Sequence, residues 1–218
     1  MAAKLITEFI GTFFLVLTIG LSVLIQAPLA ALAIASVLMV MVYMGGHVSG
    51  AHYNPAVTLA VWMRGKLPAS EIAPYMGAQI LAAIVAAFCA YIITGDVLTV
   101  APAEETSLAA FFLLELLFTF ALVIVILNVA TSVDTAGNSY FGLAIGFTVF
   151  AGAVAAGPIS GGAFNPAVAI GPILVDLISG EGTTISGLWV YLVSTFAGAA
   201  LAAIVFKMQS PADAEAAA

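Results

Sequence analysis

Charged residues are scarce in this chain. Only 7% of its 218 residues are charged, whereas a soluble domain has about 25%. The four Lys and Arg residues and the net charge of -7 exclude a basic surface that binds nucleic acid. Hydrophobic residues make up 64% of the sequence, and the mean hydropathy is +1.23. This composition predicts an integral membrane protein that lies in a lipid bilayer.

Residues that bind metals or form disulfides are also few. Cys89 is the only cysteine, so it has no partner within the chain, and its apolar surroundings favour a packing role. His47 and His52 have no cysteine or third ligand nearby, and two histidines alone make a weak metal site. We therefore predict no metal and no cofactor. We also do not expect an enzyme, because no nucleophile, base and orienting partner can be assembled.

Long apolar windows dominate the rest of the chain. Six of them lie near the roughly 20 residues that cross a bilayer core, at residues 5–25, 29–46, 72–94, 108–130, 140–156 and 186–206. Two further apolar pieces, at 55–63 and 166–178, are too short to cross. We predict an all-α membrane protein with six transmembrane helices and two half-helices. Residues 1–218 form a single transmembrane domain, with a loose tail at 209–218.

A duplicated motif opens both short pieces. Asn54-Pro55-Ala56 recurs 111 residues later as Asn165-Pro166-Ala167, each after a short Gly-containing stretch and before a valine. Asn can cap the free N–H groups of a helix, and proline fits the first turn because its missing donor is not needed there. Each motif therefore starts a half-length helix. We assign the first repeat to about residues 4–94 and the second to about 107–208.

The placement of charges indicates how the half-helices lie in the membrane. If they are re-entrant, one membrane face carries the basic residues Lys4, Arg64, Lys66 and Lys207. The other face then carries the acidic residues Asp96, Glu104, Glu105, Asp176 and Glu181. By the positive-inside rule, this arrangement places both termini in the cytoplasm. Three spans per repeat is an odd number, so we predict an inverted 3+3 repeat.

Inverted half-helices should meet near the membrane midplane with their N-termini facing each other. Non-helical backbone is tolerated at that depth only where it is buried or lines a watery cavity. The candidate hydrogen-bond acceptors along such a cavity are the carbonyls of Gly50, Ala51, His52, Tyr53, Gly161, Gly162 and Ala163. Asn54 and Asn165 would supply amide donors at its centre. Such a path suits small neutral solutes that form hydrogen bonds, and it repels cations.

The chain closely resembles the aquaporin, or major intrinsic protein, family over nearly its whole length. The resemblance rests on the two Asn-Pro-Ala motifs, on Glu8-Phe9-Ile10-Gly11-Thr12 and Glu115-Leu116-Leu117-Phe118-Thr119, on Gly46-His47-Val48-Ser49-Gly50, and on Ala78-Gln79. It implies six tilted helices around a pore, a homotetramer with one pore per subunit, and passive flow of water or small uncharged solutes. It also implies a plasma or inner membrane location.

One position departs from the family pattern. Most members have arginine directly after the second Asn-Pro-Ala, and this chain has Val168. Counting from each motif as the family alignment implies, the other constriction positions are Ile34, Ala153 and Gly162. These four residues would form a wide, apolar selectivity filter without the usual arginine, and its width should admit solutes larger than water.

Two glutamates lie inside apolar spans. An intramembrane carboxylate is by default a functional hypothesis, such as proton coupling in a transporter. For Glu8 and Glu115 the resemblance implies a structural role, in which each accepts hydrogen bonds from the backbone of the nearby loop. We expect His47 to brace the first loop and His52 to line the pore.

The sequence therefore predicts a passive channel for small uncharged solutes, namely glycerol, urea, metalloid acids, hydrogen peroxide or ammonia, with some water. A water-selective aquaporin is the first alternative. An inverted-repeat secondary transporter is more remote, and it would require a coupling ion. A structural membrane protein with a closed pore would give no solute flux at all.

Overall fold

Six long helices and two short ones make up most of residues 1–210. The computed structural model describes residues 1–210, and every regular element within them is a helix. The long helices are α1 (Ala2–Leu24), α2 (Ala30–Ser49), α4 (Ala69–Thr94), α5 (Leu108–Thr131), α6 (Phe141–Ser160) and α8 (Leu188–Gln209). The short ones are α3 (Pro55–Met63) and α7 (Pro166–Ser179), and the 3-10 turns η1 (Val133–Thr135) and η2 (Thr183–Gly187) complete the set.

The predicted spans agree closely with the observed helices. All six long segments are long and apolar enough to cross a membrane. The largest difference is in α6, which was expected to end at residue 156 and continues through Pro158 to Ser160. The N–H of Gly161 bonds to the Gly157 carbonyl, so the last turn closes despite the proline. Of the predicted tail, Gln209 belongs to α8, and residues 211–218 lie outside the described part of the chain.

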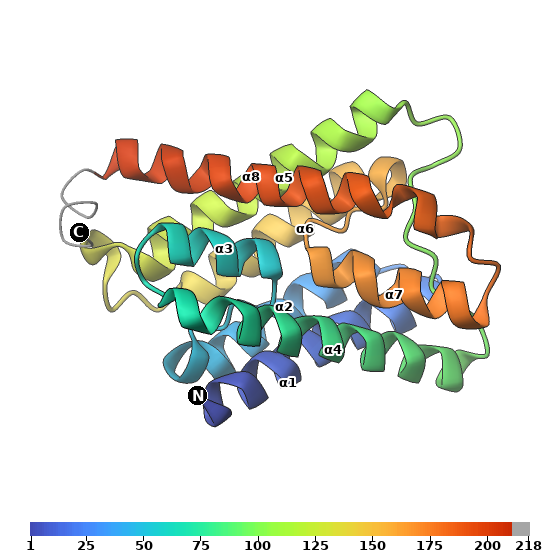
Figure 1. The fold of residues 1–218 in the computed structure, drawn as a ribbon, viewed down its shortest axis with the longest axis horizontal. Coiled ribbons are helices and arrows are strands. Elements are labelled where there is room, and N and C mark those ends of the chain that lie inside the picture. The colour runs from blue at the N-terminus through green and yellow to red at the C-terminus, as the bar shows by residue number, and fades with distance from the viewer. Residues whose placement is uncertain (211–218) are drawn as a thin grey trace.

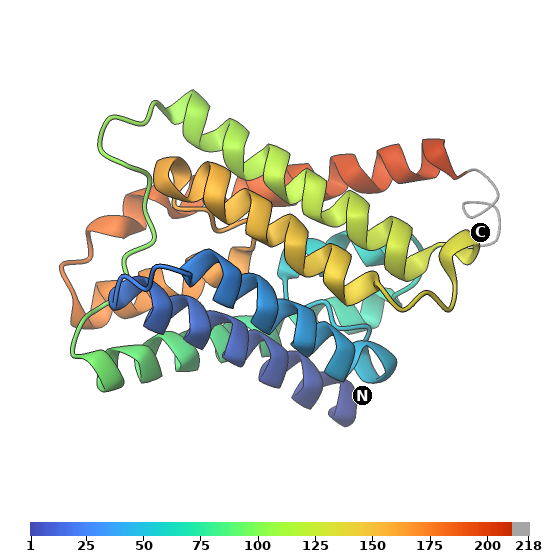
Figure 2. The ribbon, with the colours of Figure 1, turned by 180° about the vertical axis from the view of Figure 1, so that it is seen from behind.

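The long helices pack as two groups of three. Helix α1 packs on α2 and α4, helix α5 packs on α6 and α8, and α2 packs on α6 between the groups. Figure 2 shows α2 and α6 side by side across the middle of the bundle. The N-terminus and the end of α8 lie at one end of the bundle (Figure 1). We call the opposite end, where residues 25–29, 95–107 and 180–187 join helices, the distal end.

The two half-helices are held by helices of both groups. Helix α3 packs on α8 and α4, and α7 packs on α4 and α8. The contact between α7 and α4 is very close, because a Cβ atom on Gly171 would lie 2.6 Å from the Ala83 carbonyl oxygen. From the middle of the bundle, α3 runs toward the end with the N-terminus and α7 runs toward the distal end (Figure 1).

Polar groups are buried inside the bundle, and apolar side chains cover much of its outside. Glu8, Gln79 and Glu115 are fully buried, whereas large apolar residues such as Ile92 and Leu113 are more than half exposed. A soluble protein shows the reverse distribution. The fold is that of an all-α membrane protein whose outer surface is suited to lipid.

Candidate conduction pore

A cavity of about 430 Å³ runs between the two groups of helices. Four long helices line it, through Leu15, Ile19 and Val23 of α1, Ile34, Leu38 and Val42 of α2, Leu122 and Ile126 of α5, and Ile145, Val149 and Ala153 of α6. Both motif loops reach it as well, through Ala51 to Asn54 and through Gly161 to Asn165. The cavity therefore has an aliphatic wall and a polar wall.

The two motif asparagines meet at this cavity. Asn54 caps α3 by accepting from the Ala56 N–H at 2.8 Å, and Asn165 caps α7 by accepting from the Ala167 N–H at 2.9 Å. Asn54 Nδ2 donates to the Phe164 carbonyl, and Asn165 Nδ2 donates to the Tyr53 carbonyl, both at 2.9 Å. Each amide nitrogen carries two hydrogens, so one remains for a molecule in the cavity.

A buried carboxylate holds the N–H groups of each loop. Glu8 accepts from the His52 N–H at 2.9 Å and from the Tyr53 N–H at 2.7 Å. Glu115 accepts from the Ala163 N–H at 3.1 Å and from the Phe164 N–H at 2.8 Å. Because these donors point away from the cavity to the carboxylates, the loops present mainly carbonyl oxygens to it.

The backbone directly before each motif asparagine is strained. Tyr53 and Phe164 both have φ near +50°, in the left-handed region that residues with side chains rarely adopt. The hydrogen bonds from their N–H groups to Glu8 and Glu115 stabilise this conformation. The carbonyls of Tyr53 and Phe164 are also the ones that accept from the asparagine of the opposite loop. In each half of the molecule, the strained residue is therefore hydrogen-bonded both to a buried carboxylate and to a motif asparagine.

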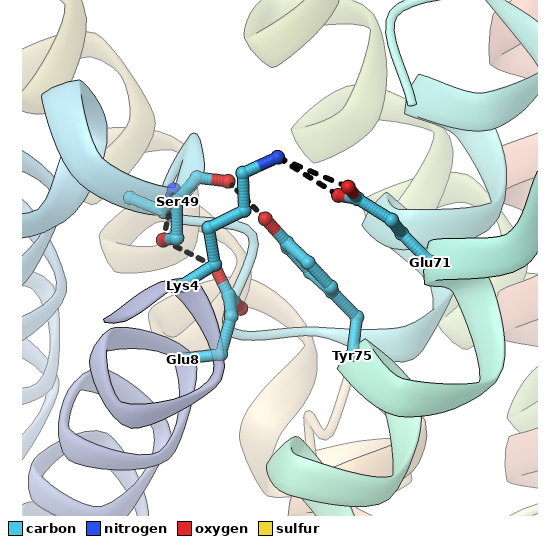
Figure 3. A network of polar contacts seen from close by, with 6 residues as sticks. Lys4, Glu8, Ser49, Glu71 and Tyr75 are labelled. Atoms are coloured by element: carbon cyan, nitrogen blue, oxygen red, sulfur yellow. Dashed lines mark hydrogen bonds and ion pairs between the residues drawn. The ribbon is translucent and has the colours of Figure 1, made fainter. Parts of the chain in front are cut away.

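In both halves, a serine at the helix end before the loop donates to the buried carboxylate, and its carbonyl accepts from a tyrosine hydroxyl. Ser49 donates to Glu8 at 2.7 Å, and the Tyr75 hydroxyl donates to the Ser49 carbonyl at 2.8 Å. Figure 3 shows this network, with the Lys4–Glu71 ion pair of 2.9 Å joining α1 and α4 beside it. In the second half, Ser160 donates to Glu115 at 2.7 Å, and Tyr191 donates to the Ser160 carbonyl.

Two residues near the first loop differ from expectation. His47 was expected to brace the loop, but its side chain is exposed on the last turn of α2 and forms no hydrogen bond within residues 1–210; Ser49 holds that place instead. Gly50 ends α2 with φ +88° and is not among the residues that line the cavity. Tyr53 lines the cavity, and its carbonyl oxygen, which has two lone pairs, accepts one bond from Asn165.

The sequence of residues 1–206 matches the family model described as major intrinsic protein. The chain belongs to the major intrinsic protein family.

Curated relatives agree with this membership. The chain is 37% identical to Aquaporin NIP1-4 of Oryza sativa subsp. japonica, over 94% of this chain and 76% of the relative. It is 33% identical to Nodulin-26 of Glycine max, over 94% of this chain and 77% of the relative. Among solved structures, the aquaglyceroporin from Plasmodium falciparum superposes with a TM-score of 0.86 at 24% identity, over 97% of this chain and 98% of that one. That likeness shows the fold.

As a major intrinsic protein, the chain is a membrane channel and not an enzyme. Within residues 1–210 no group of three His, Cys, Asp or Glu side chains lies close enough together to hold a metal ion. His52 lines the channel cavity, and its Nδ1 lies 3.1 Å from the Thr58 hydroxyl. Its ring is therefore fixed against α3.

All four residues predicted for the selectivity filter line the channel cavity. They come from different parts of the fold: Ile34 from α2, Ala153 from α6, Gly162 from the second loop and Val168 from the first turn of α7. None of their side chains can donate a hydrogen bond. The Gly162 N–H is bonded to the Ser160 hydroxyl at 3.2 Å, so it is not free for a solute either.

The residues Leu98 to Ala101 also line the channel cavity, and sequence reasoning missed them. They belong to the connection between α4 and α5, which was noted only for its acidic residues. The sequence carries only a weak signal here, the apolar residues Leu98 and Val100 at alternate positions. Both are buried in the structure. Because the segment is not a helix, it has no 3.6-residue repeat of apolar side chains that would mark it in the sequence.

Proposed function

We propose that this chain is a passive channel for small uncharged solutes. Glycerol, urea, undissociated metalloid acids, hydrogen peroxide and ammonia are the candidates, with some water. The observation that carries this proposal is the cavity, which joins an aliphatic wall to a row of carbonyl acceptors and two asparagine donors. A solute that offers hydrogen-bonding groups on one edge and little charge fits both walls.

Two helix N-termini at the centre set the electrostatics. Helices α3 and α7 both start at the cavity, and each N-terminus is equivalent to about half a positive charge. A cation in the cavity would be repelled, and the aliphatic wall cannot replace its hydration shell. We therefore expect the channel to exclude protons and metal cations even though position 168 is valine.

Val168 accounts for the expected solute size. Arginine at this position would narrow the passage and add a fixed charge, and valine does neither. Together with Ile34, Ala153 and Gly162, it would give a wide filter that admits three-carbon solutes. An apolar filter makes no hydrogen bond to offset the dehydration of a solute, so strongly hydrated molecules should pass more slowly.

Stopped-flow light scattering on proteoliposomes, with a panel of solutes, tests the proposal. Wild-type protein should pass glycerol and urea down their gradients, without saturation and independently of pH and sodium. Val168→Arg should lose glycerol flux while water flux stays comparable, and Val168→Ala, which keeps the filter wide and apolar, should retain glycerol.

Three results would contradict the proposal. Wild-type vesicles that respond only to water would identify a water-selective aquaporin. Flux that requires a proton or sodium gradient would identify a secondary transporter. Unchanged selectivity in Val168→Arg would show that residue 168 does not line the constriction.

We also propose a homotetramer with one pore per subunit, in the plasma or inner membrane, with both termini cytoplasmic. Basic residues Lys4 and Lys207 at the end with the N-terminus support the orientation, and the exposed apolar faces of the helices offer area for both lipid and neighbouring copies. Native mass spectrometry from detergent should give four times the 22.2 kDa chain mass. A monomer at all detergent concentrations would contradict the assembly.

A further inference from the structure

The connection between α4 and α5 forms a fixed wall at the distal mouth of the cavity. It runs across the distal end of the bundle in both views (Figures 1 and 2). Leu98 is buried beside Gly20 of α1, and Val100 is buried as well. Farther along, the Ala103 N–H and the Thr106 hydroxyl donate to the Ile159 carbonyl at 3.0 and 2.9 Å. The segment is therefore anchored to α1 on one side and to α6 on the other.

The same segment also touches the second motif loop. The Ala101 carbonyl lies so close to Gly161 that a Cβ atom on the glycine would be 2.8 Å from its oxygen. Between the buried Leu98 and Val100, Thr99 is an exposed residue that lines the cavity. Because its neighbours are packed, Thr99 is held in place at the mouth.

Thr99 supplies a side-chain hydroxyl, a group that no other described residue of the cavity's distal wall carries. Among the described residues that line the cavity, the other polar side chains are His52, Tyr53, Asn54 and Asn165, all in the two motif loops. The N–H groups of residues 161–164 are bonded to Gly157, Ser160 and Glu115, so that loop offers acceptors. The Thr99 hydroxyl makes no hydrogen bond within residues 1–210 and is free to donate or accept.

We propose that Thr99 is a specificity-determining residue at the distal mouth. It hydrogen-bonds an oxygen of a neutral polyol or amide and so offsets part of the dehydration that the apolar filter of Ile34, Ala153, Gly162 and Val168 imposes. This inference rests on the proposed solute channel. The hydroxyl that a solute meets at the distal mouth would then belong to the connection between α4 and α5, which lies outside both motif loops.

The test compares Thr99→Val, which keeps the shape but removes the hydroxyl, with Thr99→Ser, which keeps the hydroxyl. Glycerol and urea permeability of proteoliposomes should fall about two- to tenfold in Thr99→Val, the change expected for one lost hydrogen bond. Thr99→Ser should remain within about twofold of wild type. Water permeability is measured on the same vesicles, and a change of less than about twofold shows that the Thr99→Val channel is folded and open.

Thr183→Val is the matched control. Thr183 is also exposed at the distal end, its hydroxyl makes no hydrogen bond within residues 1–210, and it does not line the cavity. Solute permeability should be unchanged in this variant. Wild-type glycerol flux in Thr99→Val, or an equal loss in Thr183→Val, would overturn the role of Thr99 and leave the solute channel intact. A wild-type protein that passes neither glycerol nor urea would instead overturn the proposed function.

Discussion

The Gln79 side chain donates to Glu8 Oε2 at 2.8 Å, in addition to the bonds that Glu8 receives from Ser49 and from the first loop. No side-chain amide reaches Glu115 in the part of the chain that the structure describes. Both halves hold their motif loop with a buried carboxylate, but Glu8 accepts one more hydrogen bond than Glu115. Gln79 also donates to the Thr58 hydroxyl at 2.9 Å, so α4 ties the carboxylate to α3.

Replacing Gln79 by leucine should therefore destabilise the protein. The buried Glu8 carboxylate and the buried Thr58 hydroxyl would each lose one donor and keep their other partners. The expected cost is therefore that of the lost bonds, about 0.5–1.5 kcal/mol for the hydroxyl and about 1.5–3 kcal/mol for the carboxylate. Thermal unfolding of the detergent-solubilised channel should show a clear fall in midpoint. Gln209→Leu, the same change at an exposed site, is the control. Equal midpoints for the two variants would show that the Gln79 bond contributes nothing measurable.

Close packing between α7 and α4 gives a second prediction. Gly171→Ala would place a Cβ atom 2.6 Å from the Ala83 carbonyl oxygen, and backbone cannot move aside as a flexible side chain can. Overpacking of this kind costs about 1–3 kcal/mol. Gly46→Ala in α2 would meet its nearest neighbour, the Phe141 ring, at an ordinary 3.5 Å and should change the midpoint little. If both variants unfold at the wild-type temperature, α7 is less tightly held than the structure indicates.

Most of the fold could be predicted from the sequence because two strong signals carry it. Apolar windows near the length of a bilayer core gave all six spans, and the Asn-Pro pairs gave the starts of α3 and α7 at Pro55 and Pro166. The error at the end of α6 has a local cause. The predicted span stops at residue 156, directly before Gly157 and Pro158. The absent N–H of Pro158 leaves the surrounding turns intact, and the helix ends only at Gly161, with φ +89°.

The site was less predictable, because its parts depend on tertiary contacts. Nothing in the local sequence shows that Asn54 donates to the Phe164 carbonyl, 110 residues away. Nor does it show that Ser49 rather than His47 holds the first loop, since both lie on the last turn of α2 and only their direction differs. The wall formed by Leu98 to Ala101 follows from where the α4–α5 connection crosses the bundle, which no periodic pattern records.

The crossed hydrogen bonds of Asn54 and Asn165 predict strong coupling between the two loops. Either asparagine changed to alanine removes a helix cap worth about 1 kcal/mol and one bond to the opposite loop. Because both bonds lie in one network, the double variant should lose less stability than the two single variants together. The control cycle pairs Asn54→Ala with Asn128→Ala, whose side chain bonds only within α5, and should be additive. Additive losses for both cycles would show that the loops are stabilised independently.

Membrane orientation can be decided with single cysteines, since the chain has only Cys89 to remove first. In a Cys89→Ser background, Glu104→Cys reports the distal end and Lys66→Cys the end with the N-terminus; both positions are exposed. If the positive-inside rule holds, a membrane-impermeant maleimide added to intact cells should label residue 104 and spare residue 66 until the cells are broken. Labelling of residue 66 in intact cells would place the termini outside, and labelling of both positions would show that the two populations coexist in opposite orientations.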